Sequence, residues 1–407
     1  MARRIAPVWL IGLSGAPFGF YGGIGFYAIP QLLAARHVPE EQIAGLDGLL
    51  FLPLLLSVLV APVLDVRFSR RWYATLCCAL AAVLMVAAML NLGQIRVLGA
   101  LLLAGYLSIA LFGAALGGWL ASVIPSADQP SLSAWYNVAN IGAGGLMALV
   151  SVRIIRHLPL PVASGLLGCM ILLPTTVFLF MPAPGPDRRL ARESFSGLMR
   201  SIGSLFRRAE VQLVLLLFIL PSSSFTLTNI LSGLGADFHT SEGTVSLING
   251  VGITGAGIIA CLTGGFLCAR LPLRRLYLGI GIVGGLFTLS LLLAPHTALG
   301  FGVATLGENA FQALAFTVLT ALSLRTVGHD NALAATEMSI LVAVANVPLF
   351  YMQFVDSHAY KVHGLVGAFS TDAGVSIAVC AALLGLLAYL RLRSPQQETV
   401  AVPGPGD

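Results

Sequence analysis

Residues 57–76 read SVLVAPVLDVRFSRRWYATL, and this stretch decides how the chain is organised. An apolar run ends at Asp65, and the next apolar run begins just after Arg70 and Arg71. A short charged turn between two apolar runs is typical of two membrane helices that meet at the membrane surface. We expect Asp65, Arg67, Arg70 and Arg71 to form a latch of ion pairs and helix-dipole contacts, which holds one conformation and releases in another.

The composition places the chain in a lipid bilayer. Hydrophobic residues make up 57% of the sequence and charged residues only 10%, and the mean hydropathy is +0.92. Soluble domains carry about 25% charged residues, so a soluble globular domain is excluded. The net charge is +5, but the arginines stand singly or in pairs between apolar runs and form no basic face. We therefore expect no nucleic-acid partner.

A membrane span needs about 20 mostly apolar residues. Twelve such runs occur, at 8–34, 43–64, 72–92, 97–123, 131–152, 161–181, 210–235, 244–268, 275–295, 299–324, 332–356 and 370–391. If the amino terminus lies in the cytoplasm, the few basic residues on the opposite side are Arg36, Arg96, Arg153, Arg156 and Lys361. The positive-inside rule thus predicts a multi-pass protein with both termini cytoplasmic.

A weaker copy of the charged turn follows the apolar run 250–268, where Arg270, Arg274, Arg275 and Tyr277 occur. Arg70-Arg71-Trp72-Tyr73 aligns with Arg274-Arg275-Leu276-Tyr277, so the chain consists of two similar halves. We predict an all-α membrane protein with twelve transmembrane helices in two pseudo-symmetric six-helix bundles. The predicted parts are a first bundle at 1–181, a cytoplasmic linker with an amphipathic helix at 182–209, a second bundle at 210–393 and a disordered tail at 394–407.

Polar side chains inside spans are costly and are therefore candidates for function. Glu308 lies near the middle of the tenth run, one helical turn before Gln312. Burial in hydrocarbon disfavours the charged carboxylate, which suits a proton-coupling site, although a neutral Glu308 in a helix–helix hydrogen bond is the structural alternative. Glu337 is the second coupling candidate, with a gate or a helix-dipole contact as its alternative role. The candidate substrate-binding residues are Tyr21, Tyr27, Gln31, Tyr136, Asn137, Asn140, Asn229, Asn309, Gln312, Asn346 and Gln353.

The sequence contains no recognisable enzyme motif, such as a zinc-protease, nucleophile-elbow or phosphate-loop pattern. The six cysteines lie in apolar runs or at their ends, without a CxxC pair, and the histidines belong to different loops. We expect no catalysis, no metal site and no cofactor, with a proton gradient as the energy source.

The charged turn resembles the loop between the second and third helices of major facilitator transporters. Within that superfamily, the first 76 residues resemble the peptide/acetyl-coenzyme A transporter family. The resemblance rests on Gly15-x-Pro17-x-Gly19, the loop HVPEEQI at 37–43, Pro53, and APVLDVRFSRRW at 61–72. The family includes muropeptide permeases, acetyl-coenzyme A transporters and inner-membrane importers of ferric siderophores. Muropeptide permeases usually carry two further spans, so the twelve-span length is more similar to the siderophore importers.

The resemblance implies a secondary transporter of the bacterial inner membrane that works by alternating access. We expect proton-coupled uptake of a medium-sized polar small molecule such as a ferric siderophore, carried out by a monomer. The alternatives are a permease of the muropeptide or acetyl-coenzyme A type, an exporter of drugs or metabolites with the same fold, and a membrane sensor that transports nothing.

Overall fold

The computed structural model describes residues 6–50, 52–66, 68–182, 200, 202–223, 225–231 and 233–393. All regular secondary structure in these ranges is helical. The predicted amphipathic linker helix at 182–209 and the predicted tail at 394–407 fall largely or wholly outside the described residues. Arg67 of the predicted latch lies outside them as well.

The helices of the first half follow the first six predicted spans. They are α1 (Val8–Gly12), α2 (Ala16–Gly23), α3 (Ile29–Ala34), α4 (Glu40–Leu49), α5 (Leu52–Val60), α6 (Arg70–Leu90), α7 (Ile95–Val123), α8 (Gln129–His157) and α9 (Leu160–Leu172). Short 3-10 segments at Leu13–Gly15, Ala61–Asp65 and Leu173–Phe180 and a π-helical turn at Ile24–Ala28 continue these helices. The first span is therefore a chain of short segments, whereas spans three to five are long uninterrupted helices.

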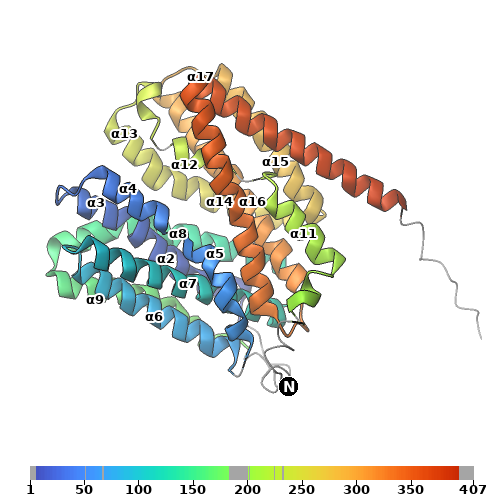
Figure 1. Cartoon of the computed structure of the whole chain (residues 1–407), viewed down its shortest axis with the longest axis horizontal. Helices are drawn as coiled ribbons and strands as arrows, with labels where there is room; N and C mark the ends of the chain where they lie inside the picture. Colours follow the sequence, from blue (N-terminus) through green and yellow to red (C-terminus); the bar gives the residue numbers. More distant parts are fainter. Residues whose placement is uncertain are drawn as a thin grey trace, which may run out of the picture.

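The second half follows the remaining predicted spans. Its helices are α11 (Ala209–Ile219), α12 (Leu227–Leu231), α13 (Glu242–Leu247), α14 (Ile253–Cys268), α15 (Leu273–Ser290), α16 (Ala298–Val327) and α17 (Ala334–Arg393). A π-helical turn at Ile248–Gly252 joins α13 to α14, and 3-10 turns lie at Gly235–Phe238 and Leu291–Leu293. α17 contains the last two predicted spans, because the chain reverses direction at His363 and Gly364 (Figure 1). Gly364 has a φ of 61°, a conformation that glycine adopts without steric cost.

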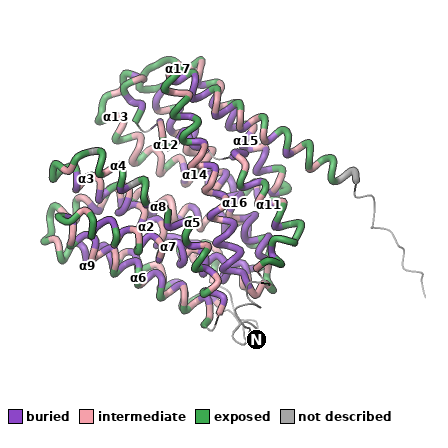
Figure 2. The backbone as a smooth tube through the Cα atoms, in the orientation of Figure 1, coloured by how far each residue is buried: buried purple, intermediate pink, exposed green. Residues whose placement is uncertain are grey.

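Eight helices in the described ranges are long and apolar enough to cross a membrane, and Leu52–Asp65 and Ala209–Ile219 are shorter apolar helices. Buried residues lie between the helices and exposed residues on the outer sides of the peripheral helices (Figure 2). Many exposed residues are large and apolar; Leu59 is 77% exposed and Leu293 is 90% exposed. In water such a surface would be unfavourable, so the outer surface is one that faces lipid.

The seventh span is broken at Pro221, because proline cannot donate the backbone hydrogen bond that would continue α11. Backbone that leaves the helix inside a membrane must find other partners for its polar groups. Ser376 donates to the Pro221 carbonyl at 3.4 Å, and Gln312 donates to the Phe225 carbonyl at 3.4 Å. Side chains of α16 and α17 therefore stabilise the unwound segment.

The two halves lie side by side, with the blue to green helices on one side of the molecule and the yellow to red helices on the other (Figure 1). Within the first half α2 packs closely on α8, where a Cβ atom on Gly19 would overlap the backbone oxygen of Asn140. Between the halves, α8 contacts α14 and α16, while α5 and α7 contact α17. These contacts leave a cavity between the halves.

Candidate functional site

The cavity has a volume of about 350 Å³ and is lined by side chains of both halves. The first half contributes residues of α2, α5, α7 and α8, and the second half contributes residues of α12, α16 and α17. No lining residue in the described part of the chain is charged. The polar lining residues are Ser57, Tyr106, Tyr136, Asn137, Asn140, Asn229, Gln312, Thr320, Ser323, Ser339 and Asn346.

The amide side chains of this cavity are held by bonds to the protein. Asn137 donates from Nδ2 to the Ser133 carbonyl at 2.9 Å and to Thr320 Oγ1 at 3.0 Å, the second bond crossing between the halves. Asn346 donates to the carbonyl of Val342 at 2.8 Å. Carbonyl oxygens only accept hydrogen bonds, so these contacts orient each amide nitrogen toward the protein. The amide oxygens of Asn137 and Asn346 have no hydrogen-bond partner among the described residues, and they remain as acceptors for a ligand.

The structure brings some of the predicted substrate-binding residues together and separates others. The cavity contains Tyr136, Asn137, Asn140, Asn229, Gln312 and Asn346. Tyr21 is buried away from it and donates to the Leu102 carbonyl at 3.1 Å, and Asn309 donates to the Thr305 carbonyl of its own helix at 2.8 Å. Tyr27, Gln31 and Gln353 are exposed on the surface of the molecule and do not line the cavity.

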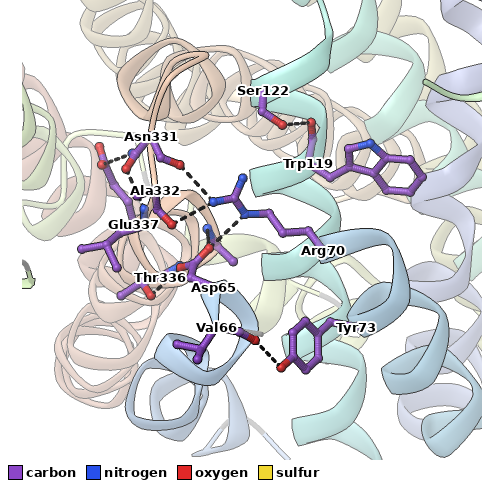
Figure 3. A network of polar contacts seen from close by, with 12 residues as sticks. Asp65, Val66, Arg70, Tyr73, Trp119, Ser122, Asn331, Ala332, Thr336 and Glu337 are labelled. Atoms are coloured by element: carbon purple, nitrogen blue, oxygen red, sulfur yellow. Dashed lines mark hydrogen bonds and ion pairs between the residues drawn. The ribbon is translucent and has the colours of Figure 1, made fainter. Parts of the chain in front are cut away.

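At the end of the cavity that Met338 and Ser339 line, Asp65 of the predicted latch connects the halves (Figure 3). The Asp65 side chain is fully buried and accepts hydrogen bonds from the backbone nitrogens of Ala335 and Thr336 at 3.1 and 2.8 Å. It also accepts from Thr336 Oγ1 at 2.7 Å and from Arg70 Nε at 2.9 Å. A carboxylate is thus placed at the amino-terminal end of α17, where the helix dipole and the free N–H groups favour negative charge.

Arg70 completes the latch by reaching the same segment of the second half. Its Nη2 atom donates to the carbonyls of Asn331 and Ala332, both at 2.9 Å (Figure 3). Arg71 differs from the prediction, because it makes no ion pair within the described part of the chain. The latch therefore consists of Asp65 and Arg70 together with the loop before α17.

Beside the latch, α7 packs so closely against the start of α17 that no space remains for further atoms. A Cβ atom on Gly118 of α7 would lie 2.6 Å from the backbone nitrogen of Ala335. Ser57 and Ser339, which belong to opposite halves, are joined by a hydrogen bond of 3.0 Å between their hydroxyl oxygens. The halves are held together near Asp65 by close backbone packing as well as by the hydrogen bonds of the latch.

Glu337 belongs to the border of the latch and does not line the cavity. Its Oε2 atom accepts from Arg208 Nη1 at 2.9 Å and from Asn331 Nδ2 at 2.6 Å. Arg208 lies near the end of the predicted linker, and Leu205 packs with Leu333 of the loop before α17. The carboxyl group therefore ties the end of the linker to the latch, and both the coupling role and the gate role of Glu337 stay predictions.

Glu308 is completely buried in α16 and lies outside the cavity, one turn away from Gln312, which lines it. Thr288 Oγ1 lies 2.5 Å from Glu308 Oε1 and 3.0 Å from the Gly284 carbonyl. A hydroxyl group has a single proton, so both contacts are satisfied together only if Glu308 supplies the second proton. The geometry fits a neutral Glu308, which suits both a coupling role and a purely structural one.

Sequence reasoning missed Asp372, Thr336 and Ser339. Asp372 lies inside the predicted twelfth span, and a charged side chain in hydrocarbon is the signal that could have found it. Thr336 and Ser339 offer no comparable signal, since hydroxyl side chains in helices usually bond to their own backbone. Their roles depend on the contact between α17 and the first half.

No family model matches the chain, and no curated protein matches it in sequence. Solved structures nevertheless match the fold over nearly the whole length. The E. coli fucose:proton symporter FucP has a TM-score of 0.67 at 12% identity, covering 92% of this chain and 98% of that one. The proton:xylose symporter XylE has a TM-score of 0.65 at 12% identity and 94% coverage of both chains. A bacterial homologue of the iron transporter ferroportin, in an outward-facing state with soaked iron, has a TM-score of 0.63 at 14% identity, with coverage of 96% and 100%.

These likenesses confirm the predicted fold. The chain has the all-α architecture of the major facilitator superfamily, with two helical bundles around a central cavity. It is a multi-pass membrane protein by its apolar helices. The narrower resemblance to the peptide/acetyl-coenzyme A transporter family stays a prediction.

Proposed function

We propose that the chain is a secondary transporter that moves an uncharged polar solute by alternating access, with protons as the coupling ion. The observation that carries this proposal is the central cavity, which both halves line and which the latch closes at one end. Every latch contact between the halves must break before the cavity can open toward Asp65. With Asp65 on the cytoplasmic side, as the positive-inside rule predicts, this conformation faces outward.

The chemistry of the cavity favours an uncharged substrate. Its lining combines apolar surface with hydroxyl and amide groups, and the described lining residues include none that could neutralise a charge. Burying an unpaired charge is far more costly than burying a polar group that finds hydrogen bonds. Acetyl-coenzyme A carries phosphates and muropeptides carry carboxylates, so both fit this lining less well. Donor groups on the solute would meet the amide oxygens of Asn137 and Asn346.

The volume favours a compact solute. A cavity of about 350 Å³ is near the lower end of the range of roughly 300–1,000 Å³ for small-molecule sites. A sugar-sized molecule fits such a space directly, while a ferric siderophore without net charge needs further widening at the outer end. Uptake across a bacterial inner membrane is the direction that we propose, with protons moving inward through Glu308.

The test is proton flux into proteoliposomes that contain a pH-sensitive dye. A neutral ferric siderophore, a neutral sugar, a muropeptide and acetyl-coenzyme A are added one at a time. We expect flux with an uncharged solute, loss of flux and of accumulation in Glu308→Gln, and retained solute binding in that variant. Glu242→Gln changes an exposed carboxylate and is the matched control.

Three outcomes would contradict the proposal. Accumulation that survives Glu308→Gln would remove this residue from coupling. Binding without flux would indicate a uniporter or a membrane sensor, and efflux of hydrophobic cations would indicate an exporter.

A further inference from the structure

Three buried carboxyl groups meet in the second half, away from the central cavity. Glu308 lies in α16, while Asp356 and Asp372 lie on the two limbs of α17 on either side of the reversal at His363 and Gly364. Glu308 and Asp356 are completely buried, and Asp372 is 4% exposed. The helices that carry them contact one another and α15. The fold thus brings three acidic side chains near one another inside the protein.

These side chains interact with one another. Asp356 and Asp372 are close enough to share a hydrogen bond, and Glu308 is close enough to both for like charges to repel. No basic group acts on any of the three in the described part of the chain. His358, Lys361 and His363 lie near Asp356 along the chain and are exposed. The other ionisable groups of α15, α16 and α17 include Arg274, Arg275, Tyr277, Arg325, Glu337, Tyr351, Tyr360, Cys380 and Tyr389.

The hydrogen bonds of this cluster are incomplete without additional protons. Both carboxylate oxygens of Asp356 and Oε2 of Glu308 are buried and have no hydrogen-bond partner among the described residues. Ionised carboxylates only accept hydrogen bonds, so Asp356 and Asp372 cannot satisfy each other while both are charged. One proton between them makes one carboxyl group a donor to the other. Two adjacent carboxyl groups that share a proton are a recognised way to avoid burying two like charges.

A metal ion is a poorer occupant of this point. Within the described residues, no group of three His, Cys, Asp or Glu side chains has the arrangement of a metal site. A proton needs only the two facing carboxyl groups, which the reversal of α17 brings together.

We propose that Asp356 and Asp372 form a proton-binding site that holds one shared proton, beside a second proton on Glu308. Binding forms an O–H bond on one aspartate with a proton taken from water, and release returns that proton to water. The inference relies on the proposed function only in assigning these protons to transport. Glu308 is then the member of the cluster nearest the cavity, through Gln312 one turn further along α16.

The test is infrared spectroscopy of the purified full-length protein in lipid nanodiscs, which needs no transport substrate. Protonated carboxyl groups show a carbonyl stretch that carboxylates lack and that shifts in heavy water. At neutral pH we expect the wild-type protein to show such a band, with one part lost in Asp356→Asn and in Asp372→Asn. The double variant should lose no more than either single variant, because the proton is shared. Glu308→Gln should remove a separate part of the band.

Two measurements distinguish the loss of a proton-binding site from a folding defect in the variants. Asp237→Asn is the matched control, because Asp237 lies outside the cluster, where it accepts a hydrogen bond from the Tyr360 hydroxyl at 2.6 Å, and the band should stay unchanged. Titration of the wild-type protein to alkaline pH needs no variant, and the band should disappear as the shared proton leaves.

A spectrum without a protonated carboxyl band at neutral pH would overturn the proposal. So would a band that both aspartate variants retain. Thermal stabilisation by sodium ions that is lost in Asp356→Asn, without a carboxyl band, would assign the site to sodium instead. A band without proton-coupled transport would leave the site intact and refute only the proposed coupling.

Discussion

Replacing Asp65 by asparagine is predicted to release the latch and to shift the protein toward the conformation open on the Asp65 side. The carboxylate accepts three hydrogen bonds from the opposite half, from the nitrogen of Ala335 and from the nitrogen and hydroxyl of Thr336. It also pairs with Arg70. Asparagine keeps one acceptor oxygen and turns an NH₂ group toward atoms that are themselves donors.

The size of the shift follows from these contacts. A hydrogen bond to a charged group contributes about 1.5–3 kcal/mol, and asparagine loses at least one of the three outright. Loss of the negative charge at the amino-terminal end of α17 adds roughly 0.3–1 kcal/mol. Arg70 stays bonded to two carbonyls, so the loss of its ion pair leaves its buried charge only partly without partners and adds little to the cost. The sum is about 3 kcal/mol, or roughly a hundredfold change in the ratio of the two conformations.

Accessibility of a single cysteine in the cavity measures that ratio. Ser323 lines the cavity and its hydroxyl has no partner within the described ranges, so Ser323→Cys disturbs little. The exposed native Cys169 is replaced by serine, and the other native cysteines are buried. In inverted vesicles, a membrane-impermeant maleimide should label the cysteine roughly a hundred times faster after Asp65→Asn.

Asp330→Asn is the control for the labelling experiment, because Asp330 is exposed and close to the same loop. It should leave the labelling rate unchanged. An equal rate in Asp65→Asn and in the parent would refute the reasoning, since it would mean that the latch contributes nothing to closure.

Two further perturbations use the same labelling assay. Arg208→Ala should raise the rate about fivefold, because the Arg208 side chain is 41% exposed and its pair with Glu337 is worth about 1 kcal/mol after screening by solvent; an unchanged rate would make this pair irrelevant to the latch. Gly118→Val should raise the rate by tenfold or more, because overpacking against Ala335 costs about 1–3 kcal/mol in the closed state only. Gly113→Val is its control, since a Cβ atom there meets nothing nearer than 4.0 Å, and equal effects of the two would contradict a specific role of the close approach.

The second copy of the charged turn shows how far sequence symmetry extends. Arg274 occupies the position that corresponds to Arg70, but Ala269 occupies the position that corresponds to Asp65. Arg274 instead lies 3.9 Å from Glu210 on α11, within its own half. Similar sequence therefore predicted two related halves, while a single missing carboxylate leaves the latch in one copy only.

The amide residues of the cavity were predictable because amides inside hydrocarbon need a polar surrounding. Which face of a helix they occupy was less predictable, because both the lipid-facing and the protein-facing sides of a membrane helix are apolar. Asn137 and Asn346 face the cavity, whereas Gln31 and Gln353 lie on the exposed surface. Periodicity could not separate these cases.

The sequence by itself determined the membrane environment, the position of the spans and the charged turn at Asp65, since hydrophobicity and charge act locally along the chain. Only the tertiary structure decided which polar groups meet. The cavity needs helices from both halves, and the carboxyl cluster needs Glu308, Asp356 and Asp372 to converge from three helical segments. Such convergence depends on helix packing and on the reversal of α17, because the free energy of a buried charge is set by the atoms around it.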